Sequence, residues 1–309
     1  MIHESKTGLK TNFLSSLDFD KSEMENLFDL AKSFKQKSYE NKCQGKVLGL
    51  IFDKASTRTR VSFQVAMHNL GGTTVDLNPN TSQIGRGELI KDTARVLSKY
   101  CSVLAIRTFK QENLYEYAKW SSIPVINALT DLEHPCQALA DYLTILEEFE
   151  DFNNVTLTYL GDGNNVANSL ILGGAILGVN IRVASPKGFE PKEEIVRKAR
   201  EIYDNPNKLL ITNNIYEAVQ GANVLYTDVW SSMGEEKDAE LKNSQFKGFT
   251  LNSKILNSAR EDVIVLHCLP AYRGKEISSN VIESNSSRIF HQAENRLYAQ
   301  QALLSLILS

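Results

Sequence analysis

A turn rich in hydroxyl and guanidinium groups is the first feature of the sequence that could do chemistry. Residues 56–60 read Ser-Thr-Arg-Thr-Arg, between an apolar run that ends near Asp53 and a segment with helical spacing. A helix N-terminus offers unpaired backbone N–H groups and a partial positive charge, which hydroxyls and guanidiniums would reinforce. The turn therefore predicts a pocket for a phosphate-like anion, with an ordinary helix cap followed by surface arginines as the alternative.

Three further segments with the pattern of strands end in groups that can stabilise negative charge or exchange a proton. These groups are Arg107 after 103–106, His134 and Gln137 after 125–128, and His267 with Cys268 after 263–266. In open α/β sheets, ligands bind outside the carboxyl ends of the strands, where all of these residues would fall. Fixed donors such as Arg107, His134 and Thr59 could hold an oxygen on which negative charge develops. Taken alone, each group is also compatible with a solvated strand end or a helix start.

A zinc site is an alternative use of the histidines and cysteines. His134, Cys136, His267 and Cys268 formally make a Cys₂His₂ set. Adjacent residues of a strand point to opposite faces, so we expect His267 and Cys268 not to bind one metal together. The sequence therefore predicts no metal centre.

The glycine-rich segment at 161–165, Gly-Asp-Gly-Asn-Asn, invites a dinucleotide-binding interpretation because it ends a strand and opens a helix. Its third glycine position holds Val166, and the next strand ends at Ala184-Ser185, where an acidic ribose ligand would be expected. An NAD-linked oxidoreductase is therefore disfavoured. A non-catalytic module that binds a phosphate ligand is a second alternative, although no candidate catalytic group is visibly missing.

Strands and helices alternate along the whole chain and would position these groups. Predicted strands cover 46–52, 74–77, 103–107, 124–128, 155–160, 180–184, 209–212, 223–229 and 263–268. Predicted helices cover a first segment with a capping box at Ser22 and Glu25, then 59–70, 89–100, 112–120, 135–149, 165–177, 193–203, 215–220, 252–258 and 296–308. The alternation is typical of an α/β fold with two domains, each an open parallel sheet covered by helices.

The length of the chain also favours two domains. At 309 residues it exceeds what one hydrophobic core usually serves. We expect domains at 1–150 and 151–309, with the polar segment 147–154 as the junction and the final helix, 296–308, packing back on the first domain.

Composition limits the partners and the compartment. Lys and Arg total 34 against 37 Asp and Glu, with no basic block, so nucleic acid is not an expected partner. The four cysteines are widely spaced, which fits reduced thiols and the cytoplasm. The first ten residues have no apolar run of a secretion signal, and the apolar stretch 170–179 is too short to span a membrane.

In their order along the chain, these motifs resemble those of the aspartate/ornithine carbamoyltransferase family. In that family, the Ser-Thr-Arg-Thr-Arg turn and the His-Pro-Cys-Gln segment at 134–137 mark the carbamoyl phosphate site. The resemblance implies that domain 1–150 binds carbamoyl phosphate and that Gln83 reaches a phosphate in the neighbouring subunit. The residues that it implies for this ligand are Ser56, Thr57, Arg58, Thr59, Gln83, Arg107, His134, Gln137, Cys268, Leu269 and Arg296.

The acceptor side of the resemblance rests on two segments of the second half. Asp-Val-Trp-Ser-Ser-Met-Gly at 228–234 and His-Cys-Leu-Pro at 267–270 mark the amino-acid site in the ornithine branch of the family. The resemblance implies that domain 151–309 binds ornithine through Asn165, Asp228, Ser232 and Met233. An acid at Asp228 suits a cationic α-ammonium group. Putrescine, acetylornithine and aspartate are alternative acceptors, but the intact Ser-Met-Gly and His-Cys-Leu-Pro segments favour ornithine.

The resemblance also implies a reaction, transfer of the carbamoyl group of carbamoyl phosphate to the δ-amine of ornithine, giving citrulline and phosphate. It makes Arg107, His134 and Cys268 the catalytic residues, with Cys268 beside the amine as a proton acceptor. No Gly-x-Ser-x-Gly elbow surrounds a serine, so direct attack through a tetrahedral intermediate is simpler than a covalent intermediate. The resemblance further implies no cofactor, no membrane partner, and a homo-oligomer that is a trimer or a multiple of one.

Overall fold

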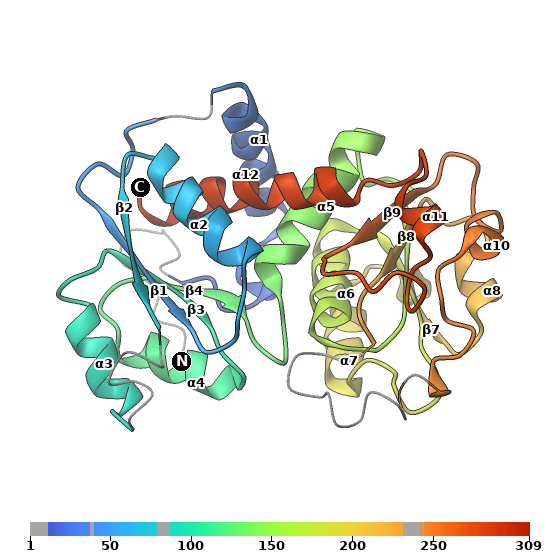
Figure 1. Ribbon diagram of the computed structural model, residues 1–309, viewed down its shortest axis with the longest axis horizontal. Coiled ribbons are helices and arrows are strands. Elements are labelled where there is room, and N and C mark those ends of the chain that lie inside the picture. The colour runs from blue at the N-terminus through green and yellow to red at the C-terminus, as the bar shows by residue number, and fades with distance from the viewer. Residues whose placement is uncertain (1–11, 38–39, 79–86, 231–241, 243) are drawn as a thin grey trace. The chain divides into compact units, whose positions relative to one another are not determined.

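The chain folds into two compact units, each built on its own sheet (Figure 1). The computed structural model describes residues 12–37, 40–78, 87–230, 242 and 244–309. The first unit comprises Met1–Leu139 and Arg296–Ser309, and the second comprises Ala140–Asn295. The α/β class predicted from the sequence is confirmed, because both sheets are parallel throughout and are flanked by helices.

The first unit contains a four-stranded sheet with the order β2-β1-β3-β4. Its strands are β1 (Val47–Phe52), β2 (Thr73–Leu77), β3 (Val103–Arg107) and β4 (Val125–Leu129). Its helices are α1 (Lys21–Gln36), α2 (Arg58–Asn69), α3 (Ile90–Leu97) and α4 (Gln111–Trp120). Every residue of β3 and β4 is buried, as expected for apolar runs in a sheet that is covered on both faces. Helices α3 and α4 pack on one face, and α1 and α2 lie on the other (Figure 1).

The second unit contains a five-stranded sheet with the order β7-β6-β5-β8-β9. Its strands are β5 (Thr156–Leu160), β6 (Asn180–Ala184), β7 (Leu209–Thr212), β8 (Val224–Thr227) and β9 (Ile264–His267). Its helices are α6 (Asn165–Leu177), α7 (Glu193–Ile202), α8 (Ile215–Val219), α10 (Ser253–Leu256) and α11 (Ser279–Ile282). Helices α8, α10 and α11 share one apolar cluster with β5, β8 and β9.

Both sheets have a point at which the strand order reverses. The chain leaves β1 toward β2 and returns on the other side of β1 as β3, and it leaves β5 toward β6 and returns as β8. Loops that follow the strands on either side of such a point diverge from each other, which opens a crevice for a ligand. The carboxyl ends of β1 and β3, and those of β5 and β8, are therefore the places to examine for function.

Several predicted boundaries are wrong, each for an identifiable reason. The first helix is capped by Asp20 and Glu23, not by Ser22 and Glu25, because the preceding Asp-x-x-Glu pattern satisfies the same capping box. The last helix, α12 (Ile289–Ile307), begins seven residues before the predicted 296. Its first turns carry Gln292 and Asn295, which are polar in sequence but fully buried, so the pattern there is typical of a loop.

Two helices connect parts of the chain that belong to different units. Helix α5 (Pro135–Phe149) begins in the first unit, and α12 contributes its residues from Arg296 onward to the first unit.

Of the helices in the described ranges, none combines the length and the apolar character needed to cross a bilayer.

Candidate functional site

The turn at residues 56–60 lies at the reversal point of the first sheet. Helix α2 begins at Arg58, as the anion-pocket interpretation requires, and the Oγ of Ser56 accepts a hydrogen bond from the backbone N of Thr59 at 3.2 Å. Among the described residues, Thr57 forms no side-chain cap with α2. The backbone N of Asp53 donates to the carbonyl of Arg107 at 2.8 Å, which fastens the loop after β1 to the end of β3.

Arg296 connects two segments that are far apart in the sequence. One Nη donates to the Oγ1 of Thr59 at 2.9 Å and the other donates to the Oε1 of Gln137 at 2.5 Å. All three side chains are almost fully buried. Arg296 lies inside α12 and not at its start. Three of the predicted site residues are therefore in direct contact in the first unit.

His134 directly precedes α5 and is 5% exposed. Burial lowers the pKa of its imidazole well below the usual value, and the positive charges of Arg296, Arg107 and Arg58 lower it further. The ring is therefore neutral at physiological pH and can donate one hydrogen bond without carrying a charge. The influence of three arginines on this one side chain indicates a strongly cationic neighbourhood.

Two buried charged residues of the first unit were missed in the sequence. Lys54 is 9% exposed, pairs with Asp131 at 2.5 Å, and lies over the ring of Phe109. Glu133, next to His134, is buried and accepts hydrogen bonds from the Oγ of Ser15 at 2.6 Å and the backbone N of Ser16 at 2.9 Å. Burial raises the pKa of Glu133, whereas these hydrogen bonds lower it. Lys54, two residues after the apolar strand β1, could have been noticed in the sequence. Glu133 could not, because its partners Ser15 and Ser16 lie more than a hundred residues away.

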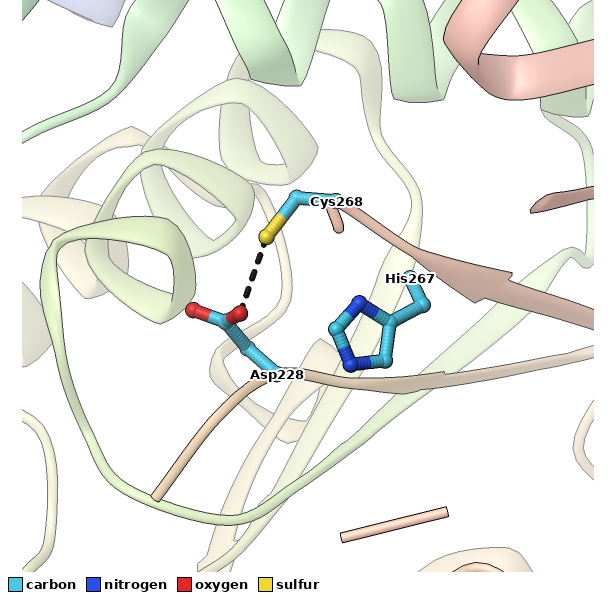
Figure 2. A group of neighbouring side chains, drawn as sticks. All are labelled: Asp228, His267 and Cys268. Carbon is cyan, nitrogen blue, oxygen red and sulfur yellow. Dashed lines mark hydrogen bonds between the residues drawn. The ribbon is translucent and has the colours of Figure 1, made fainter. Parts of the chain in front are cut away.

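Asp228 and Cys268 form the centre of the candidate site in the second unit, as Figure 2 shows. Asp228 follows β8 and is 5% exposed. The Sγ of Cys268 donates to its Oδ1 at 2.9 Å, and the Nδ2 of Asn164 donates to its Oδ2 at 3.0 Å. The structure thus joins two predicted site residues and adds Asn164, which sequence reasoning passed over in favour of its neighbour Asn165.

The predicted separation of His267 from Cys268 is wrong. The ligand atoms of Asp228, His267 and Cys268 all lie within 4.8 Å of one another. Strand β9 ends at His267, so the alternation of side chains that applies within a strand does not extend to Cys268. Figure 2 shows both side chains beside Asp228.

These neighbours nevertheless do not fit a metal centre. The Nδ1 of His267 accepts a hydrogen bond from the backbone N of Leu269 at 2.8 Å, and its Nε2 lies 3.2 Å from the Oε1 of Glu276. A metal would have to displace one of these partners. In the first unit, burial raises the pKa of Cys136 to about 12, which disfavours the thiolate that zinc requires.

The glycine-rich segment at 161–165 is explained by packing and capping. A Cβ on Gly163 would lie 2.2 Å from the backbone N of Pro191, so the glycine allows the neighbouring loop to pack closely. Asp162 pairs with Lys242 at 2.9 Å, and Asn164 caps α6. Asn165 is the first residue of that helix.

Of the remaining predicted site residues, two lie within the described ranges and three lie outside them. Arg107 ends β3 and is 6% exposed, and Leu269 is half-buried after β9. Gln83, Ser232 and Met233 lie outside the described residues.

Comparison with known proteins gives a consistent result over both halves of the chain. Residues 11–147 match the family described as "Aspartate/ornithine carbamoyltransferase, carbamoyl-P binding domain", and residues 153–307 match "Aspartate/ornithine carbamoyltransferase, Asp/Orn binding domain". The ornithine carbamoyltransferase of Prochlorococcus marinus strain MIT 9312 is 68% identical over 298 residues, which cover 96% of this chain and 97% of that protein.

Solved structures agree with the sequence relatives. The ornithine carbamoyltransferase from Pyrococcus furiosus superimposes with a TM-score of 0.92 at 43% identity, covering 96% of each chain. That from Gloeobacter violaceus gives 0.88 at 46% identity, covering 97% of this chain and 99% of the other. With both halves matched in order and near-complete coverage of its relatives, the chain belongs to the aspartate/ornithine carbamoyltransferase family.

Proposed function

We propose that this protein transfers the carbamoyl group of carbamoyl phosphate to the δ-amine of L-ornithine, giving L-citrulline and phosphate. The observation that carries the proposal is the opposite charge of the two groups of strand-end residues. The first unit gathers arginines around the neutral His134, whereas the second presents the buried acid Asp228 beside Cys268. Relatives that are named ornithine carbamoyltransferase at 68% and 65% identity support the same activity.

The first unit is proposed to bind carbamoyl phosphate, a role that we extend over residues 1–150. The hydroxyls and amides of Ser56, Thr57 and Thr59, with the guanidinium of Arg58, would hold the phosphate at the start of α2. Anions are stabilised there by the N–H groups and by the helix dipole. Arg296 would keep Thr59 and Gln137 in place, since it donates to both side chains.

The carbonyl oxygen of the donor gains negative charge when the amine attacks. We assign Arg107 and His134 to that oxygen, with Gln137 at the carbamoyl nitrogen. A neutral imidazole suits this role because it donates a hydrogen bond without repelling the nearby arginines. Such fixed donors lower the barrier because they need not reorganise as charge develops.

The second unit is proposed to bind ornithine, and we propose an ornithine-binding domain of residues 151–309 whose last helix packs back on the first domain. Asp228 would pair with the α-ammonium group, with Asn165, Ser232 and Met233 completing the amino-acid site. Cys268 and Leu269 would lie beside the reacting amine and the carbamoyl group. The δ-amine must lose a proton before it attacks, because free amines of this kind have a pKa near 10.

Cys268 is suited to receive that proton. Once its thiol, which lies beside Asp228, has lost its proton to solvent, Sγ can accept one from the δ-ammonium group, while Asp228 stays ionised and pairs with the α-ammonium group. The neutral amine then attacks the carbonyl carbon, and the bond between that carbon and the bridging phosphate oxygen breaks. The proton that the attacking nitrogen loses leaves with the phosphate. No step oxidises or reduces a substrate, so no redox cofactor is needed, and the proposed donors Arg107 and His134 would stabilise the oxyanion. We therefore propose a reaction without a cofactor or metal.

The assembly and the compartment are proposed from the family resemblance. We infer a homotrimer or a multiple of one in the cytoplasm, in which Gln83 reaches the phosphate of a neighbouring subunit. Sedimentation of the purified protein tests the assembly. A monomer with full activity would refute the role of Gln83.

An acceptor panel tests the proposed function directly. Carbamoyl phosphate would be supplied with ornithine, putrescine, acetylornithine or aspartate in turn, and each carbamoylated product quantified by mass spectrometry. We expect ornithine to be used with a kcat/KM at least about 100-fold above the others, because only it carries both charged α groups and a free δ-amine. Preference for another acceptor would replace ornithine, and no product with any acceptor would refute carbamoyl transfer.

A further inference from the structure

Asn164 uses both ends of its side-chain amide in the second unit. Its Oδ1 accepts hydrogen bonds from the backbone N atoms of Val166 at 3.0 Å and Ala167 at 3.2 Å, and from the hydroxyl of Tyr159 at 3.3 Å. Its Nδ2 donates to the Oδ2 of Asp228 at 3.0 Å. One side chain therefore links the start of α6 to the acid of the candidate acceptor site.

The orientation of this amide is forced. Backbone N–H groups can only donate, so the amide oxygen of Asn164 must face the helix and its nitrogen must face Asp228. An ionised carboxylate can only accept, so the donor that faces Asp228 matches its charged form. Cys268 supplies a donor to the other oxygen, so each oxygen of the carboxylate has its own partner and the plane of the group is fixed.

The backbone places Asn164 for this contact. Strands β5 and β8 are parallel neighbours with Leu160 opposite Thr227, so the loops that lead to Asn164 and Asp228 begin side by side. Asn164 itself has the extended backbone of an N-cap, at φ −82° and ψ −169°, and the thirteen-residue helix α6 follows it. The amide is thus anchored by a rigid element.

We propose that Asn164 is a positioning residue of the acceptor site, which holds the ionised Asp228 in the orientation that receives the α-ammonium group of the amino-acid acceptor. The proposal rests on the function proposed above. If the proposal holds, the preference for an acceptor with an α-ammonium group depends on Asn164, which acts through Asp228.

A matched pair of serine variants separates positioning from capping. Asn164→Ser keeps a good helix cap but is too short to reach Asp228, and Asn214→Ser makes the same change at the cap of α8 in the same unit. We expect Asn164→Ser to raise the KM for ornithine by about tenfold or more, the loss typical of a hydrogen bond to a charged group. The KM for carbamoyl phosphate should stay within about twofold, and Asn214→Ser should leave both constants within about twofold.

The aspartate variant gives opposite predictions for the two roles. Asn164→Asp keeps the oxygen that caps α6, so a residue that only caps would tolerate it. A positioning residue would not, because a second carboxylate would then face Asp228 at hydrogen-bond distance. We expect the KM for ornithine to rise more in Asn164→Asp than in Asn164→Ser.

Binding of two partial substrates tests the α-ammonium assignment without turnover. L-Norvaline keeps the α-ammonium and α-carboxylate of ornithine but lacks the δ-amine, and 5-aminovalerate lacks the α-ammonium. Each is titrated calorimetrically into wild type and Asn164→Ser in the presence of carbamoyl phosphate. We expect the Kd of L-norvaline to rise by about tenfold and that of 5-aminovalerate to change by less than about twofold.

The outcomes distinguish this inference from the proposed function. Absence of citrulline formation by the wild-type protein refutes the function. In Asn164→Ser, an equal loss of affinity for both ligands, or no loss for either, refutes the role of Asn164 whether or not the wild type turns over. If the wild type does turn over, wild-type activity of Asn164→Asp refutes it as well.

Discussion

The two groups of strand-end residues share one architecture but carry side chains of opposite charge. Both lie where the strand order of a parallel sheet reverses, and both include the N-terminus of a helix. In the first unit, Ser56 and Thr57 precede α2 and the exposed Arg58 begins it. Ser56 accepts one hydrogen bond, from the backbone N of Thr59, and within the described ranges Thr57 adds no side-chain cap. In the second, Asn164 closes the start of α6 and turns its amide N–H groups toward Asp228.

The difference shows two uses of a helix N-terminus: its backbone N–H groups are either available to a ligand or satisfied by a side chain of the protein. The start of α2, where Ser56 satisfies one backbone N–H group, leaves others that can attract an anion. At the start of α6, Asn164 accepts from two backbone N–H groups and holds a carboxylate that can attract a cation. Substitutions that change one of the two groups at a time therefore separate their roles.

The largest effect is expected from removing the arginine at the end of β3. Arg107→Leu should lower kcat for citrulline formation by on the order of 10²–10³, because a fixed donor to the developing oxyanion is lost. The measurement is steady-state kinetics at saturating ornithine and carbamoyl phosphate. Arg95→Leu, at an exposed position of α3 in the same unit, is the control and should keep the wild-type rate. A kcat for Arg107→Leu close to that of wild type would contradict the assignment.

The thiol of the second unit should give the next largest effect. Cys268→Ala is expected to lower kcat by on the order of 10-fold or more and to raise the KM for ornithine, because both the proton acceptor and a contact to Asp228 are lost. Cys268→Ser should recover part of the affinity but little of the rate, since a hydroxyl donates to Asp228 and gives up its proton far less readily. Cys101→Ala is the control in the first unit. Unchanged kinetics in Cys268→Ala would reduce the residue to a packing role.

Alkylation rates should distinguish the cysteines of the two units. Burial raises the pKa values of Cys43 and Cys101, and raises that of Cys136 to about 12, whereas Cys268 is only half-buried. With iodoacetamide at about pH 8, peptide mass spectrometry should therefore find Cys268 modified at least about tenfold faster than the others. Carbamoyl phosphate with L-norvaline should slow that reaction. Parallel modification of Cys136 would show that the buried description of the first site is wrong.

The smallest effect concerns the pH dependence of stability. Burial, reinforced by three arginines, holds the pKa of His134 well below its usual value. As the pH falls through about 6.5, the unfolded chain therefore gains a proton at this position that the folded protein does not, and the folded state loses stability. His134→Gln removes this contribution, so its Tm should fall less steeply than that of wild type between about pH 7 and about pH 5. Identical slopes in scanning calorimetry would mean that His134 does not titrate as described.

The sequence is a reliable guide to elements that are apolar and continuous. The segments 103–107, 135–149, 165–177, 180–184 and 209–212 were predicted with the bounds that the structure has, because apolar runs there are bounded by glycine or polar residues. The residues that follow these strands were correctly placed at the carboxyl edges of the sheets. The order of the strands was not predictable, since it depends on contacts between distant segments.

The site was less predictable where buried polar groups have distant partners. The contact of Arg296 with Thr59 spans 237 residues, and the sequence alone could only suggest it through family resemblance. The start of α12 was missed because buried Gln292 and Asn295 break the apolar pattern. Asn164 was missed because it lies in a polar segment that is typical of a loop, where the sequence does not show that one side chain both caps α6 and contacts Asp228.

One measurement tests the central claim most directly. Purified protein, treated with EDTA and free of added cofactor, is supplied with isotope-labelled carbamoyl phosphate and L-ornithine, and both products are quantified over time. Direct transfer predicts labelled citrulline and phosphate released in equal amounts at an undiminished rate. Phosphate without citrulline, or citrulline only after a metal or a nicotinamide cofactor is added, would contradict it.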